Sequence, residues 1–175
     1  MAILGQFRDL DRPDRFVWLR GFPDLTSRVG SLTEFYTGPS WKAHATAANA
    51  TMLDVGDVLL LRPVGGWSLT GTRPAVGATS PPRSRVLVTV HYRDEPFDDA
   101  YAADVDRALA CLRTEYAVND FPALPVREGV HAFVWIARFP TEAALDGYLR
   151  TAGPVEGARA TERLRLAPTA RSLLR

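Results

Sequence analysis

The sequence of 175 residues contains one cysteine, Cys111, and one lysine, Lys42, among 21 basic residues. A single cysteine excludes an internal disulfide, and no Cys/His spacing typical of a zinc site is present. No apolar run approaches the roughly 20 residues of a membrane span, and the N-terminus has no features of a secretory signal peptide. We therefore expect a cytoplasmic protein with no membrane partner.

The net charge is also small, at +1 from 21 basic and 20 acidic residues. Such a balance produces no field that attracts nucleic acid, so we expect no nucleic-acid partner. The motifs G-x-S-x-G, G-x-G-x-x-G and H-E-x-x-H and the P-loop are absent, which removes the hydrolase, dinucleotide, metalloprotease and nucleotide signatures. What the chain has is a hydrophobic fraction of 46% and an aromatic fraction of 10%, typical of a globular protein.

Two structured halves flank a segment rich in glycine and proline. Residues 65–84 read GGWSLTGTRPAVGATSPPRS, without the periodicity of a helix or a strand. We predict a first domain over residues 1–64, a linker over residues 65–84 and a second domain over residues 85–175.

The two halves carry an internal repeat. Three pairs of segments match in the same order: FVWLRGFP at 16–23 with FVWIARFP at 133–140, GP at 38–39 with GP at 153–154, and LLLRP at 59–63 with LRLAP at 164–168. Three ordered matches indicate two copies of one structural unit.

The second copy shows a complete order of elements. Alternation and apolar stripes predict strands over 85–93, 121–126, 131–139 and 162–167, and helices over 97–116 and from Thr141 to about 150. This β-α-β-β-α-β order is that of a ferredoxin-like unit.

The first copy is incomplete. It supplies a predicted hairpin over 2–9 and 15–22, helical sequence over 25–52 and a strand over 58–62, but no opening strand and helix. The missing elements leave an edge and apolar surface uncovered, and we therefore expect a homodimer.

Three stretches of the first half resemble the bacterial NIPSNAP family: ILGQFRDLDRPDRFVWLRGFPDLTSR from Ile3, FYTGPSWKAHATAANATM up to Met52, and DVLLLRP up to Pro63. The resemblance implies a fold of the dimeric α/β-barrel type, in which two ferredoxin-like sheets close into one barrel. The family's helical stretch carries an arginine where this sequence has Ala45. We predict an α+β protein: tandem ferredoxin-like repeats, the first incomplete, in a dimeric α/β-barrel-type fold.

The first candidate site lies in the helical stretch. On a helix, Trp41 and His44 share a face, and Asn49 lies near its edge. His44 is a candidate general base or haem ligand, with Trp41 and Asn49 as candidates for substrate binding. No cofactor is expected unless His44 binds haem. The alternative is that His44 is a packed interface histidine and Asn49 a capping residue.

A second candidate site follows from strand alternation. The aromatic and polar residues of three strands share one face of each strand: Phe16, Trp18 and Arg20; His131, Phe133 and Trp135; and His91. We expect the aliphatic faces to lie under helices and these faces to surround a planar ligand, with His91 and His131 as candidates for proton transfer. The alternative is that the rings fill the barrel interior.

These candidates support two functions. The first is an enzyme acting on an aromatic or polyketide-like substrate, because the barrel superfamily that the resemblance implies includes cofactor-independent oxygenases, isomerases and cyclases. The second is a non-catalytic protein for ligand binding or assembly. Both imply a small, aromatic ligand, and for any chemistry we expect His44 to contribute more than His91 or His131.

Overall fold

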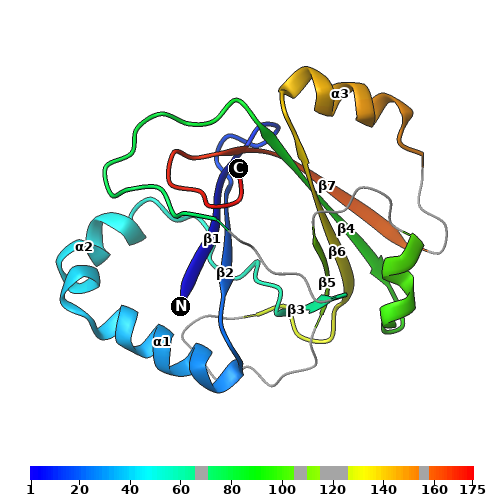
Figure 1. The fold of residues 1–175 in the computed structure, drawn as a ribbon. Coiled ribbons are helices and arrows are strands. Elements are labelled where there is room, and N and C mark those ends of the chain that lie inside the picture. The colour runs from blue at the N-terminus through cyan, green and yellow to red at the C-terminus, as the bar shows by residue number, and fades with distance from the viewer. Residues whose placement is uncertain (66–70, 105–109, 115–125, 154–157) are drawn as a thin grey trace. The chain divides into compact units, whose positions relative to one another are not determined.

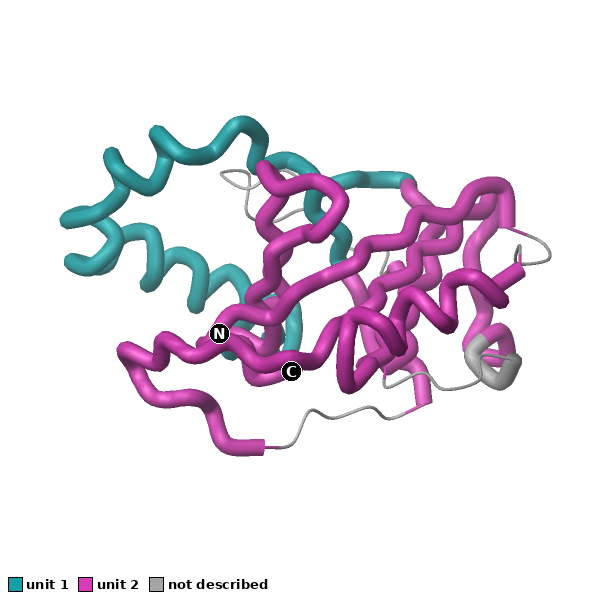
Figure 2. Tube along the Cα trace, turned by 90° about the horizontal axis from the view of Figure 1, so that it is seen from above, with its two compact units in different colours: residues 1–2, 21–60, 115–129 teal, residues 3–20, 61–114, 130–175 magenta. Residues whose placement is uncertain are grey.

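The computed structural model describes residues 1–65, 71–104, 110–114, 126–153 and 158–175. The chain divides into two compact units (Figure 2). Unit 1 comprises Met1–Ala2, Gly21–Leu60 and Glu115–Gly129, and holds helices α1 (Leu25–Thr37) and α2 (Pro39–Asn49). Unit 2 comprises Ile3–Arg20, Leu61–Thr114 and Val130–Arg175, and holds the sheet and helix α3 (Glu142–Thr151).

Within the described residues, the sheet of unit 2 has seven strands: β1 (Ala2–Asp9), β2 (Phe16–Gly21), β3 (Leu61–Val64), β4 (Arg85–Arg93), β5 (Ala110–Thr114), β6 (His131–Phe139) and β7 (Ala160–Pro168). Their order is β2-β1-β7-β4-β6-β5-β3, and the sheet is curled (Figure 1). The pairings from β1 through to β3 are antiparallel. The predicted α+β class is confirmed, and strands of both sequence halves belong to one sheet.

Several predicted elements are confirmed at or near their expected bounds. β4 and β6 span the predicted residues, and β1 and β2 are neighbours in the sheet, as the hairpin prediction requires. Helix α3 begins after Thr141, whose hydroxyl oxygen accepts a hydrogen bond from the backbone N–H of Ala144 over 3.2 Å. Thr141 is therefore the N-cap of α3.

The predicted helix over 97–116 is wrong. Its described part forms a short 3₁₀-helix, η1 (Asp99–Asp104), and strand β5, while residues 105–109 and 115–116 lie outside the described residues. In β5, buried and partly buried residues alternate, and both neighbours in the sheet are strands. Of the residues that suggested a helical stripe, Leu112 lies in β5, where its side chain is buried in the alternation of a strand. The predicted strand over 121–126 also lies outside the description, except for Val126, which belongs to no strand.

The predicted helical stretch over 25–52 is divided into two helices. Asp24 caps α1, its carboxylate accepting from the backbone N–H of Ser27 over 2.6 Å. Gly38 separates α1 from α2, and Pro39, which has no N–H, opens α2. The closing strand of this half, β3, starts at Leu61 rather than at the predicted residue 58.

One face of the sheet packs against α3, and it carries the aromatic side chains of β6. Phe133 and Trp135 of β6 share a buried cluster with Leu145, and Tyr148 of α3 packs against it. The prediction that aliphatic faces lie under helices is therefore wrong for β6. Its aliphatic residues point to the opposite face and are also buried, Val134 among them. Alternation identifies the two faces of a strand, but not what covers each.

Gly5 of β1 makes room for an aromatic ring. A Cβ at this position would collide with the ring of Phe7, which is 1% exposed. We expect Gly5→Ala to lower the free energy of unfolding by about 1–3 kcal/mol, because the buried ring has to move. In the matched control Gly30→Ala, on an open face of α1, stability should rise by about 0.5–1 kcal/mol. Urea denaturation measures both, and equal effects would contradict the account.

Candidate functional site

His91 lies on β4, on the same face of the sheet as Phe133, and is only 1% exposed. The indole Nε1–H of Trp135 donates to its Nε2 over 3.0 Å. Because an indole nitrogen only donates, Nε2 is the acceptor and the ring proton resides on Nδ1. Nδ1 then donates to Oγ1 of Thr161, 3.2 Å away. Both ring nitrogens of His91 are therefore used by hydrogen bonds within the sheet.

The charge state of His91 agrees with this bonding. Burial lowers the pKa of His91 below its ordinary value of 6.5, and the positive charge of Arg163 lowers it further. The imidazole is accordingly neutral at pH 7. With no ring nitrogen left for a substrate, this geometry favours a structural role for His91 over the predicted proton transfer.

The aromatic neighbours of His91 form a packed cluster. The ring centroid of Tyr101 lies 6.3 Å from that of His91 and 4.8 Å from that of Phe133. Phe133 is fully buried and Trp135 is 7% exposed. The structure thus brings together three of the predicted site residues, His91, Phe133 and Trp135, as a core cluster. His131 lies at the start of β6, opposite Arg93, and is half-buried.

The predicted residues of the helical stretch lie on α2 of unit 1. His44 and Asn49 are exposed there. Trp41 is partly buried, with its ring centroid 5.3 Å from that of Phe35 and 5.0 Å from that of Tyr36. Trp41 therefore packs where α1 and α2 meet, while His44 and Asn49 point to solvent.

The remaining predicted residues, Trp18 and Arg20, lie on β2. The Cζ of Arg20 is 5.7 Å from the centroid of the Trp18 ring, a cation–π distance. Phe16 meets the same ring edge-on, with 5.8 Å between centroids. Trp18 is 42% exposed and Phe16 49%, so these rings form an exposed row along the strand.

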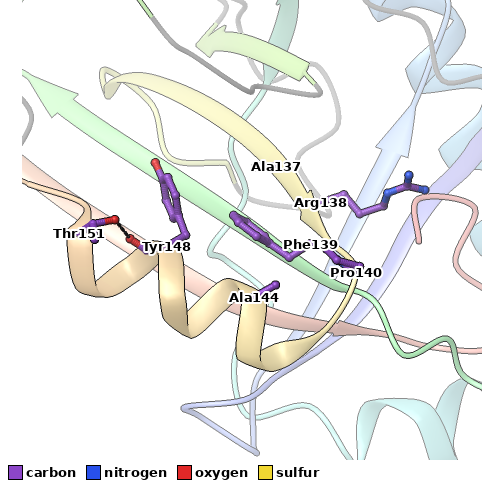
Figure 3. A pocket seen from close by; sticks show the side chains of 7 residues that line it. All are labelled: Ala137, Arg138, Phe139, Pro140, Ala144, Tyr148 and Thr151. Carbon is purple, nitrogen blue, oxygen red and sulfur yellow. Dashed lines mark hydrogen bonds between the residues drawn. The ribbon is translucent and has the colours of Figure 1, made fainter.

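A pocket of about 520 Å³ opens between the end of β6 and α3 (Figure 3). Its lining residues are Ala137, Arg138, Phe139, Pro140, Ala144, Tyr148 and Thr151. None of the nine predicted site residues lines it. Trp135 contacts one lining residue: its ring centroid lies 6.3 Å from that of Tyr148.

Two rings dominate this pocket. The centroids of Phe139 and Tyr148 are 5.3 Å apart, with their planes inclined by 43°. Figure 3 shows both rings on the same side, whereas the side chain of Arg138 points away from them. Thr151 donates its hydroxyl proton to the backbone oxygen of Tyr148 over 2.9 Å. The lining therefore combines two aromatic rings with the hydroxyl groups of Tyr148 and Thr151.

Helix α3 is held on the sheet by contacts that also fix this pocket. The side chain of Leu145, on α3 itself, is fully buried against the sheet. The guanidinium of Arg85 on β4 lies 3.0 Å from the carboxylate of Glu142, and that of Arg165 on β7 lies 2.6 Å from the carboxylate of Asp146. A fixed helix presents Tyr148 in one position, as a preformed ligand site requires.

The sequence contains a signal for this pocket that alternation and stripes did not reveal. Ala144, Tyr148 and Thr151 are spaced by four and three residues, so they share one face of α3. Phe139 is the last residue of β6, just before the turn into that helix. A strand-end aromatic followed by a helix with a partly exposed tyrosine is the pattern that could have identified the site.

Metal chemistry and a reactive thiol find little support in the described part of the chain. No group of three or more His, Cys, Asp or Glu side chains is arranged there to hold a metal ion. Burial raises the pKa of the Cys111 thiol, which keeps it protonated and unreactive at neutral pH. No helix among the described residues has the length and apolar character needed to cross a membrane.

Comparison with known proteins identifies no relative of this chain. The chain was matched against protein-family models, curated proteins and solved structures. None of the three finds a match.

Proposed function

We propose that the protein is a NIPSNAP-like α/β-barrel protein that binds a small aromatic molecule between β6 and α3. The observation that carries this proposal is the pocket of about 520 Å³, in which Phe139 and Tyr148 stand on the same side. Ligand sites typically enclose about 300–1,000 Å³ and combine aromatic walls with few polar groups. The volume of the pocket is within that range, and two aromatic rings line it.

Strand order supports the barrel-type part of the proposal. In the second copy the four strands lie in the order β7-β4-β6-β5, the order of the split βαβ unit. If the first copy lacks its opening strand, β1 and β3 are its second and fourth strands. These pair with β7 and β5, the fourth and second strands of the other copy. In each case the second strand of one copy pairs with the fourth strand of the other. This arrangement is expected when two related sheets are joined at two edges, as in a barrel.

The pocket's chemistry defines the class of ligand. Among the described residues no carboxylate lines the pocket, and the one cation in its lining, Arg138, points away from the two rings. A charged ligand would lose its hydration without gaining a counter-ion. The matching ligand is neutral, planar and aromatic, with a single polar group for the hydroxyl of Tyr148 or Thr151.

Binding is better supported than catalysis. The oxygenase, isomerase or cyclase that the family resemblance implies would need an acid–base group at the ligand. Among the described residues no histidine lines the pocket, and the nitrogens of His91 are already engaged. None of the three candidate histidines is thus placed to act on a ligand there, and we favour ligand binding as the function of this site.

We expect 2-naphthol, a neutral planar phenol, to bind the full-length chain in isothermal titration calorimetry. Tyr148→Ala removes one wall of the pocket and should weaken binding by about tenfold, close to 1.4 kcal/mol. Tyr148→Phe keeps the ring and should cost only about two- to threefold, the effect of one exposed hydrogen bond.

The matched control is Phe16→Ala, which removes an exposed ring of the same unit outside the pocket. Its affinity should equal that of the wild type. Unchanged affinity in Tyr148→Ala, or an equal loss in Phe16→Ala, would show that 2-naphthol binds elsewhere and would contradict the proposal.

A further inference from the structure

Strand β2 is an edge of the sheet, whereas its counterpart in the repeat is not. β6 carries the matching FVW segment and has strand neighbours on both sides, β4 and β5. β2 has one strand neighbour, β1, among the described strands. No described strand takes the place beside β2 that β4 takes beside β6.

Burial differs in the same way between the two strands. Phe133 is fully buried and Trp135 is 7% exposed, but their counterparts Phe16 and Trp18 are 49% and 42% exposed. An edge strand that carries a row of exposed aromatic side chains is a template for a further strand. The open edge and the exposed rings point to the same kind of occupant, a strand with complementary side chains.

The charges along β2 make this edge complementary to itself. Asp14, which is exposed, precedes the strand, and Arg20 lies near its other end. An antiparallel pair of β2 strands centred on Val17 places Asp14 opposite Arg20 of the second copy. The same register places Phe16 opposite Trp18. Two-fold symmetry repeats both pairs, giving two opposite-charge pairs and two aromatic pairs.

We propose that β2 pairs antiparallel with β2 of a second copy of this chain, and that Asp14 and Arg20 determine the register. The surface is isologous, so both copies contribute the same four side chains. The pairing continues the sheet across the two-fold axis and covers the exposed rings of Phe16 and Trp18.

Sedimentation velocity of the full-length chain across the micromolar range tests this interface. The wild type should form dimers. Asp14→Arg or Arg20→Asp alone places like charges opposite each other in both pairs, and each should weaken dimerisation by about tenfold or more. An equimolar mixture of the two variants restores opposite charges at both pairs, so it should form heterodimers with near wild-type affinity.

The matched control is Asp94→Arg, which breaks an exposed ion pair with Arg159 far from β2 in sequence. It should leave dimerisation unchanged, and circular dichroism should show native folding for every variant. A monomeric wild type, single variants that dimerise normally, or a mixture that stays monomeric would each overturn the proposal. The mixed sample keeps the test decisive, because variants that had merely lost their fold would not regain affinity on mixing.

Discussion

Phe133→Ala is expected to lower the free energy of unfolding by about 3–5 kcal/mol, the cost of removing a fully buried aromatic ring and leaving a cavity. The ring of Phe133 contacts those of Phe97 and Tyr101, at centroid distances of 5.7 and 4.8 Å. Chemical denaturation at low protein concentration measures the loss.

Phe16→Ala is the matched comparison, because Phe16 holds the same place in the repeat. Its ring is about half exposed and has one close aromatic neighbour, Trp18. The expected loss is therefore less than about 1 kcal/mol. Comparable losses at the two positions would contradict the assignment of one ring to the core and the other to an open edge.

Acidification from about pH 7.5 to pH 5 is expected to destabilise the protein through His91. In the folded state the pKa of His91 lies below its ordinary value of 6.5, because burial and Arg163 disfavour the imidazolium. Below about pH 6.5 the unfolded chain binds a proton that the folded chain does not. As the pH falls below about 6.5, the free energy of unfolding should therefore decrease by up to about 1.4 kcal/mol per pH unit until the pKa of folded His91 is reached. Above about pH 6.5, the stabilisation that comes from neutral His91 should be fully present.

His91→Gln tests the source of this pH dependence. The glutamine amide oxygen still accepts from the indole of Trp135, but it does not titrate in this range. The acid-dependent loss should shrink in His91→Gln and persist in His131→Gln, when unfolding is followed by urea denaturation at each pH. The same dependence in both variants would assign the proton uptake to another group.

Strands β4 and β6 could be predicted because their alternation is local. β4 and β6 combine β-branched and aromatic residues over nine positions each, and the structure has them at the predicted bounds. The prediction of a helix over 97–116 was wrong. It relied in part on Phe97 and Tyr101, which are four residues apart as on one face of a helix, but Phe97 lies outside any helix. In this segment pairing with β6 outweighs local preference.

The candidate site was harder to predict, because neighbouring elements decide what a face of a strand meets. The sequence places Trp18 and Trp135 in identical motifs, yet one is exposed at an edge and the other is buried under α3. The residues next to His91 in the sequence do not indicate its hydrogen bonds, because its partners Trp135 and Thr161 lie 44 and 70 residues away. Only the register of three strands brings these side chains together.

Methyl chemical shifts of the alanines, followed while 2-naphthol is added, test the ligand site most directly. Ala137 and Ala144 line the pocket between β6 and α3, whereas Ala132 lies on the same strand outside it. The account predicts saturable shifts at Ala137 and Ala144, with Ala132 unchanged, and their loss in Tyr148→Ala. Shifts confined to other alanines, or no shifts at a ligand concentration that saturates the calorimetric signal, would contradict it.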